Sequence, residues 1–188
     1  GGDRRGAEDA RRRHCGQAPS SGAADPRVAA RWDETASARA RNSLQGWLDS
    51  QSVFSEVFRA RVAGDPQGNW LEGLMRRGGV PKGGRWASLG CGAAGEEILA
   101  ARLGLFASLE GFDASPASLE LARSKVAESG LDNLTFAAID LDGFSLPAGA
   151  FDVVLMNMSL HHVRELRPAL ADVRRALAPG GALILNEF

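Results

Sequence analysis

Apolar residues in the first part of this chain recur at steps of three and four, the spacing that places side chains on one face of a helix. Two such stripes are separated by a break at Gly64-Asp65-Pro66: Val53, Phe54, Val57, Phe58 and Val62, then Trp70, Leu71, Leu74 and Met75. The pattern predicts helices between Val28 and Arg77. Two interpretations of this segment stay open: a helical subdomain packed on a core, or a lid that offers aromatic side chains to a substrate.

A glycine-rich linker ends near Gly84, and after it short apolar runs alternate with helical patterns. The predicted strands are Arg85–Gly90, Ser108–Asp113, Leu134–Ile139, Phe151–Asn157 and Ala182–Asn186. The predicted helices are Gly95–Leu103, Pro116–Ser129 and one marked by Leu166, Leu170, Val173 and Leu177 that ends near Pro179-Gly180-Gly181. Ser115 suits the N-cap of the second helix and Gly130 its exit. This alternation predicts an α/β fold with a Rossmann-like, doubly wound, mostly parallel sheet.

Composition divides the chain into three parts. We expect a disordered tail at 1–26, a helical cap and linker at 27–84, and a cofactor-binding core at 85–188. The net charge of −1 argues against a nucleic-acid partner. No apolar run approaches the roughly 20 residues of a membrane span, and no signal peptide is visible. Two cysteines and three histidines without paired spacing predict no metal site. A disulfide between Cys15 and Cys91 is not expected, which predicts a cytoplasmic protein.

The segment Gly90-Cys91-Gly92-Ala93-Ala94-Gly95 follows the first predicted strand. Glycines here let the chain turn tightly into a helix and let a ligand approach the main chain. Asp113 ends the second strand, where a carboxylate can accept hydrogen bonds from two ribose hydroxyls. Asp140 ends the third, where it can accept from an adenine amine with Ile139 or Leu141 near the ring. Together these positions predict a site for a nucleotide-type cofactor.

Four motifs match one family in order and spacing. The segments LGCGAAGEE, GFDASPASLELARSKV, FDVVLMNMSLHHV and LADVRRALAPGGALILNEF resemble the class I S-adenosylmethionine-dependent methyltransferases, over about Arg85 to Phe188. The resemblance implies strand order 3-2-1-4-5 and S-adenosylhomocysteine as the product. The family's sheet normally continues beyond strand five, so we expect its C-terminal strands to be missing from this sequence.

The resemblance also implies which residues bind the cofactor. These are Ser88, Gly90, Cys91, Gly92, Asp113, Ala114, Asp140, Leu141 and Asn157. Gly90 and Gly92 would lie against the methionine part, and Asn157 would face that end and the substrate. The family often has an acidic residue two positions before the first glycine, near the amino group of the cofactor. Ser88 stands there instead and carries no charge.

Two alternatives come from other functional classes. Gly90, Gly92 and Gly95 also satisfy GxGxxG, which is typical of an NAD(P)-binding oxidoreductase. Asp140 and the LHHV and LAPGG segments have no role in that pattern, and the chain has no tyrosine for a hydride-transfer site. A non-catalytic cofactor-binding or interaction domain is the second alternative, because a sheet ending at strand five would expose an edge.

His161 and His162 follow the fourth strand at the mouth of the expected site. Imidazole has a suitable intrinsic pKa for a general base, which methyl transfer needs only when the nucleophile holds its proton tightly. We predict His161 as base or substrate ligand and His162 as a weaker candidate; the alternative is a packing role for one and a solvent-exposed cap for the other. Asn157 is not followed by the Pro-Pro-Tyr of base and amide methylases, which favours a small-molecule acceptor. The sequence leaves the acceptor and the oligomeric state open.

Overall fold

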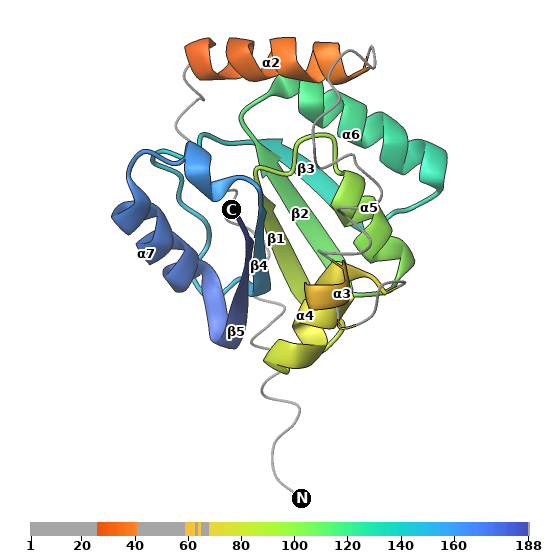
Figure 1. Cartoon of the computed structure of the whole chain (residues 1–188). Coiled ribbons are helices and arrows are strands. Elements are labelled where there is room, and N and C mark those ends of the chain that lie inside the picture. Colours follow the sequence, from red (N-terminus) through yellow and green to blue (C-terminus); the bar gives the residue numbers. More distant parts are fainter. Residues whose placement is uncertain (1–25, 41–58, 63, 65–67, 188) are drawn as a thin grey trace, which may run out of the picture.

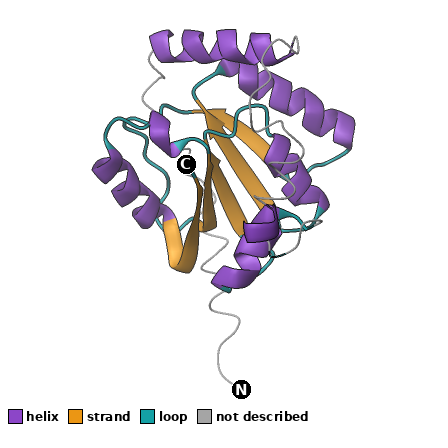
Figure 2. Cartoon of the chain, viewed as in Figure 1, coloured by secondary structure: helices purple, strands orange, loops and turns teal. Residues whose placement is uncertain are grey.

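A computed structural model of the chain describes residues 26–40, 59–62, 64 and 68–187. The predicted tail up to residue 25 and most of the first apolar stripe, 53–58, lie outside these residues. The described part forms one parallel sheet with helices on both faces (Figures 1 and 2). This arrangement confirms the predicted α/β class.

The sheet has the order β3-β2-β1-β4-β5, and every neighbouring pair is parallel. Its strands are β1 (Arg85–Leu89), β2 (Ser108–Asp113), β3 (Leu134–Ala138), β4 (Phe151–Asn157) and β5 (Leu177–Asn186). The predicted strand order is therefore confirmed. Because the strands are parallel, their carboxyl ends, with the segments that follow them, meet at one edge of the sheet.

The helices are α2 (Pro26–Ala40), α3 (Ala60–Val62), α4 (Trp70–Gly78), α5 (Gly95–Arg102), α6 (Pro116–Ser129), α7 (Leu166–Ala176) and the short 3-10 helix η3 (Leu160–His162). Helix α6 has the predicted bounds. The Ser115 side chain accepts a hydrogen bond from the backbone N–H of Ser118, and Gly130 ends the helix in the left-handed conformation at φ +66°. Local capping chemistry alone fixes both ends of this helix.

The predicted end of the last helix was wrong. Helix α7 ends at Ala176, and β5 begins at Leu177 rather than Ala182. The ring of Pro179 disfavours helical backbone angles at the preceding residue, Ala178, so the helix does not continue through it. The pairing then shifts register: Phe151 lies opposite Leu177 and Val153 opposite Ala182, so the Pro179-Gly180-Gly181 turn is taken up as an irregularity in the strand.

The predicted buried face of α7 also needs correction. Leu166 and Leu170 are exposed, with 47% and 38% of their surface accessible. The buried residues of this helix are Ala169, Val173 and Ala176. The residues that α7 buries are therefore smaller than the leucines that the pattern predicted.

Core residues lie on both faces of the sheet. One cluster joins Trp70 of α4 and Trp86 of β1 to α5 and α6, and the other joins β4 to Val173 of α7. Along β4, Val153 and Leu155 belong to the first cluster, and Val154 and Met156 belong to the second. The near-continuous apolar run of this strand therefore reflects burial on both sides, as predicted.

The described helices of the N-terminal segment lie at opposite ends of the sheet. In Figure 1, α2 lies at the top beside the start of α6, and α4 lies at the bottom close to the start of β1. Asp33 of α2 accepts hydrogen bonds from the Ser115 hydroxyl at 2.5 Å and from the Ala117 N–H at 3.1 Å. Helix α2 is thereby attached to the carboxyl edge, whereas α4 is part of the core.

Candidate cofactor and acceptor site

The loop after β1 holds two glycines in the left-handed region, Gly90 at φ +75° and Gly92 at φ +54°. A Cβ on Gly90 would lie 2.4 Å from the Ser159 Cβ, so the segment after β4 packs directly on this glycine. A Cβ on Gly92 would meet no described atom within 4 Å. The main chain at Gly92 therefore borders open space, as a backbone cradle for a ligand requires.

The third left-handed position of the loop is Ala94, at φ +56°. It is fully buried and precedes the first residue of α5. A non-glycine residue in this region costs of order 1 kcal/mol. Gly95, which completes the GxGxxG pattern, has no positive φ, so at this position the conformation does not require a glycine.

Asp113 at the end of β2 ties that strand to the glycine loop. Its Oδ2 accepts the Gly92 N–H at 2.8 Å and its Oδ1 accepts the Ser115 N–H at 2.9 Å. Burial raises the pKa of Asp113, although these backbone hydrogen bonds lower it. Each carboxylate oxygen keeps acceptor capacity beyond one bond. This side chain therefore fits the two hydroxyls of a ribose beside the loop.

The segment after β3 reaches the same place. The Asp140 Oδ1 accepts the Asp142 N–H at 2.9 Å, which fixes a local turn. The Leu141 side chain lies 3.6 Å from where a Gly90 Cβ would be. The structure thus brings the glycine loop, Asp113 and Leu141 together at the ends of three adjacent strands.

Cys91, between the two glycines of the loop, is buried against β2. Cys91 lies with its Sγ 3.0 Å from the position of a Gly111 Cβ, so β2 needs glycine there. Burial raises the pKa of the Cys91 thiol well above its usual value, and the carboxylates Glu97 and Asp113 raise it further. The thiol is therefore protonated at neutral pH and is a poor nucleophile.

Ser88 has a partner that the sequence did not reveal. Its hydroxyl donates to the Glu97 Oε1 at 2.6 Å, and both residues are buried. Glu97 lies in the first turn of α5, and burial raises its pKa to about 7. A carboxyl group thus lies next to the position where Ser88 replaces an acidic residue, but it comes from the helix instead of the strand.

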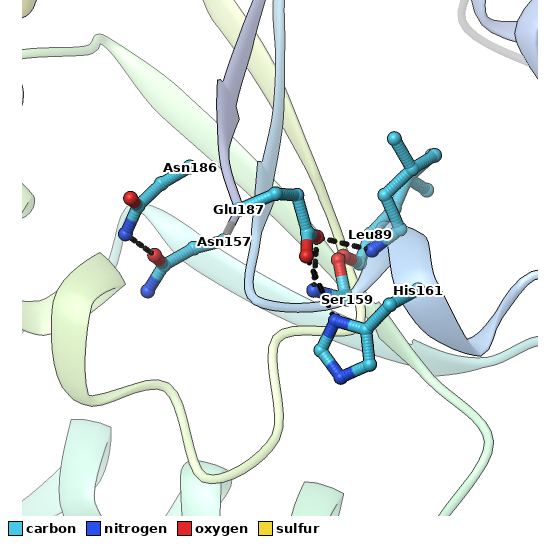
Figure 3. Close-up of polar contacts among 7 residues, drawn as sticks. Leu89, Asn157, Ser159, His161, Asn186 and Glu187 are labelled. Carbon is cyan, nitrogen blue, oxygen red and sulfur yellow. Dashed lines mark hydrogen bonds and ion pairs between the residues drawn. The ribbon is translucent and has the colours of Figure 1, made fainter. Parts of the chain in front are cut away.

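A polar cluster follows β4 (Figure 3). The Ser159 hydroxyl donates to the Leu89 carbonyl at 2.6 Å, which joins this segment to the end of β1. The Asn186 side-chain amide donates to the Asn157 Oδ1 at 2.6 Å. The His161 Nδ1 lies 2.7 Å from the Glu187 Oε2. His161 is 48% exposed, so its ring is accessible at this edge.

His162 packs against the N-terminal segment. Its ring centroid lies 4.4 Å from that of Trp32 and 3.9 Å from that of His161. Burial lowers the pKa of His162, and the neighbouring His161 lowers it further. Helix α2 therefore contacts the start of α6 through Asp33 and the turn after β4 through Trp32. The lid interpretation of residues 27–84, and any contact of this segment with an acceptor, remain predictions.

The fold and these strand-end residues define a class I S-adenosylmethionine-dependent methyltransferase domain. Residues 87–185 match the family described as "Methyltransferase domain", and the chain belongs to that family. The comparison confirms the predicted cofactor class and does not favour a dinucleotide-binding oxidoreductase.

Individual relatives agree with this assignment. A demethylmenaquinone methyltransferase of Tropheryma whipplei is 31% identical over 120 residues, 64% of this chain and 48% of its own. A 2-heptyl-1-hydroxyquinolin-4(1H)-one methyltransferase of Mycobacteroides abscessus is 34% identical over 127 residues, 66% of this chain and 54% of its own. This chain thus spans about half the length of these curated relatives.

A solved structure shows the same fold. The S-adenosylmethionine-dependent methyltransferase of Mesorhizobium loti superposes with a TM-score of 0.51 at 30% identity, over 55% of this chain and 46% of that one. The residues of the present chain fit the cofactor, because Gly92 leaves room along the backbone and Asp113 offers acceptors for a ribose. Among the described residues, no three His, Cys, Asp or Glu side chains form a group that could hold a metal ion, and none of the helices has the length and apolar character of a membrane span.

Asp113→Ala should weaken binding of S-adenosylhomocysteine by roughly 1–3 kcal/mol, because buried ligand hydroxyls would lose their acceptor. Isothermal titration calorimetry measures this difference. Asp132→Ala is a matched control, since Asp132 is exposed and lies in the loop before β3. Equal affinities of the Asp113 variant and the unmodified chain would remove this carboxylate from the site.

Proposed function

We propose that this protein transfers a methyl group from S-adenosylmethionine to a small-molecule acceptor whose hydroxyl group loses its proton to His161. The supporting observation is the half-exposed imidazole of His161, on the turn directly after β4. Ser159 fastens this turn to the end of β1, next to the glycine loop. A base at this edge would lie between the cofactor loop and solvent, where an acceptor enters.

The chemistry requires little from the protein beyond positioning and one proton transfer. When bound, S-adenosylmethionine would supply an electrophilic methyl group; the acceptor oxygen would bond to this carbon, and the electron pair of the broken S–C bond would stay on sulfur to give S-adenosylhomocysteine. His161 takes up the hydroxyl proton, and the O–H electron pair stays on the oxygen. Proximity and exclusion of water supply much of the remaining acceleration.

The names of the relatives support a small acceptor. One is named for demethylmenaquinone and another for a hydroxyquinolinone. Only the hydroxyquinolinone carries a hydroxyl group, so we take a ring-bearing hydroxyl compound of that kind as the first candidate acceptor of the present chain. The net charge of −1 supports a small molecule over a nucleic acid, and the two widely separated cysteines support a cytoplasmic location.

His161→Ala should lower turnover about 100-fold or more, the usual contribution of a positioned base, with little change in cofactor affinity. Transfer of labelled methyl groups to 2-heptyl-1-hydroxyquinolin-4(1H)-one measures turnover, and titration with S-adenosylhomocysteine measures affinity. His162→Asn is the comparison, with a smaller expected loss. Full turnover by the His161 variant would exclude it as the base.

A further inference from the structure

The carboxylate of Glu187 makes three hydrogen bonds to the turn after β4. Its Oε1 accepts the backbone N–H groups of Ser159, at 2.8 Å, and Leu160, at 2.5 Å. Its Oε2 lies 2.7 Å from the Nδ1 of His161. Figure 3 shows the carboxylate between the turn and the imidazole ring. One carboxylate oxygen thus binds the backbone of the turn, and the other binds the imidazole ring.

The charge on Glu187 determines which ring nitrogen of His161 carries the hydrogen. Burial raises the pKa of Glu187, but the hydrogen bonds from His161, Leu160 and Ser159 outweigh it and hold this pKa below its usual value. An ionised carboxylate only accepts hydrogen bonds. The hydrogen between Glu187 and the ring therefore belongs to Nδ1, and in the neutral ring the free electron pair is on Nε2.

We propose that Glu187 is the positioning residue of His161 and holds its imidazole in the Nδ1–H tautomer, so that Nε2 accepts the proton of the methyl acceptor. This inference rests on the proposed function, in which His161 is the base. The hydroxyl proton moves to Nε2, its electron pair stays on the acceptor oxygen, and the imidazolium that forms lies beside the Glu187 carboxylate. The second histidine does not compete, because burial lowers the pKa of His162 and its ring packs on Trp32.

Nitrogen-15 NMR of the full chain with labelled histidine tests the tautomer without any acceptor. Loss of signals in His161→Asn assigns the ring. At pH 8 the unmodified chain should show mainly Nδ1–H, and Glu187→Leu should lose that preference. Asn186→Ala is the matched control: it removes the neighbouring side-chain hydrogen bond to Asn157 and should leave the tautomer unchanged. An Nε2–H ring in the unmodified chain, or the same tautomer in the Leu variant, would overturn the proposal.

Glu187→Gln covers the case in which the Leu variant does not fold. An amide oxygen can still accept from the backbone of the turn, but the negative charge is gone. The NH2 group of the amide then faces Nδ1 and can only donate to it, so the neutral ring should change to the Nε2–H tautomer in the same NMR experiment. Retention of Nδ1–H as the main tautomer in Glu187→Gln would refute the positioning role. Failure of the proposed function has a different signature, full turnover in His161→Ala with the tautomer of the unmodified chain as expected.

Discussion

Gly92→Val should abolish binding of S-adenosylhomocysteine. The main chain at Gly92 borders open space, because a Cβ there would meet no described atom within 4 Å. A valine side chain would fill the volume in which we place the cofactor. A measurable Kd for the unmodified chain in calorimetric titration, and no detectable heat of binding for the variant, is the expected result. NAD in a parallel titration should not bind to either.

The Gly92→Val variant could lose binding through backbone strain or through steric blocking of the cofactor site, and a control variant separates the two effects. Gly92 has φ +54°, a conformation that a β-branched residue adopts at a cost of about 1–3 kcal/mol. Gly104 is a matched control, because it has φ +63°, also has open space at its Cβ and lies between α5 and β2. Gly104→Val should lower the melting temperature to a similar extent and still bind S-adenosylhomocysteine. Unimpaired binding by the Gly92 variant would refute the loop assignment.

Local patterns predicted the sheet well, because its strands are short apolar runs with clear boundaries. The limits of β2 and β4 were predicted without error, and those of β1 and β3 to within one residue. The error at α7 and β5 has a different origin. The register shift between Phe151 and Val153 depends on pairing with β4, which is a tertiary contact. No local pattern of the Pro179-Gly180-Gly181 segment encodes that pairing.

In the candidate site too, the features set by local sequence were predicted, and those set by tertiary contacts were missed. Asp113, the glycine loop and Leu141 follow strands directly, so the topology brings them together as predicted. Glu187 and Glu97 were missed because each acts across the fold, Glu187 on the turn after β4 and Glu97 on Ser88. One signal was available: Ser88 lacks the expected charge, and two consecutive glutamates begin the helix after the loop. A search for a compensating acid could have found Glu97.

The buried carboxyl group of Glu97 should make the stability of the fold depend on pH. Burial, with smaller contributions from the charges of Glu96 and Asp113, raises its pKa from the usual 4.5 to about 7, although the hydrogen bond from Ser88 lowers it. Within the described residues, no ion pair neutralises this carboxylate. The folded chain therefore binds a proton at Glu97 more tightly than the unfolded chain does.

The sign of the effect follows from linkage. Below pH 4.5 the carboxyl group is protonated in both states and favours neither. Between pH 4.5 and about pH 7 the unfolded chain ionises first, so the free energy of unfolding falls as the pH rises. Above that range the free energy of unfolding falls no further on account of Glu97. The total loss is roughly 3 kcal/mol, because the pKa rises from 4.5 to about 7 on folding.

Glu97→Gln should remove this loss. The amide oxygen can still accept the hydrogen bond from Ser88, and a neutral side chain has no charge to bury. Urea unfolding at pH 4.5 and pH 8 measures the difference; the Gln variant should gain up to about 3 kcal/mol relative to the unmodified chain on going from the lower to the higher pH. Any packing defect of the amide is present at both pH values and cancels in this comparison.

Glu120→Gln is the control for the Glu97 variant, because Glu120 is exposed on α6. Its stability relative to the unmodified chain should be the same at both pH values. Asp113, Glu96 and Glu110 also have raised pKa values because of burial, and they remain in both chains. The difference between Glu97→Gln and the unmodified chain therefore isolates Glu97. An equal difference at pH 4.5 and pH 8 would mean that this carboxyl group ionises in the fold as it does in water, with solvent reaching the floor of the cofactor loop.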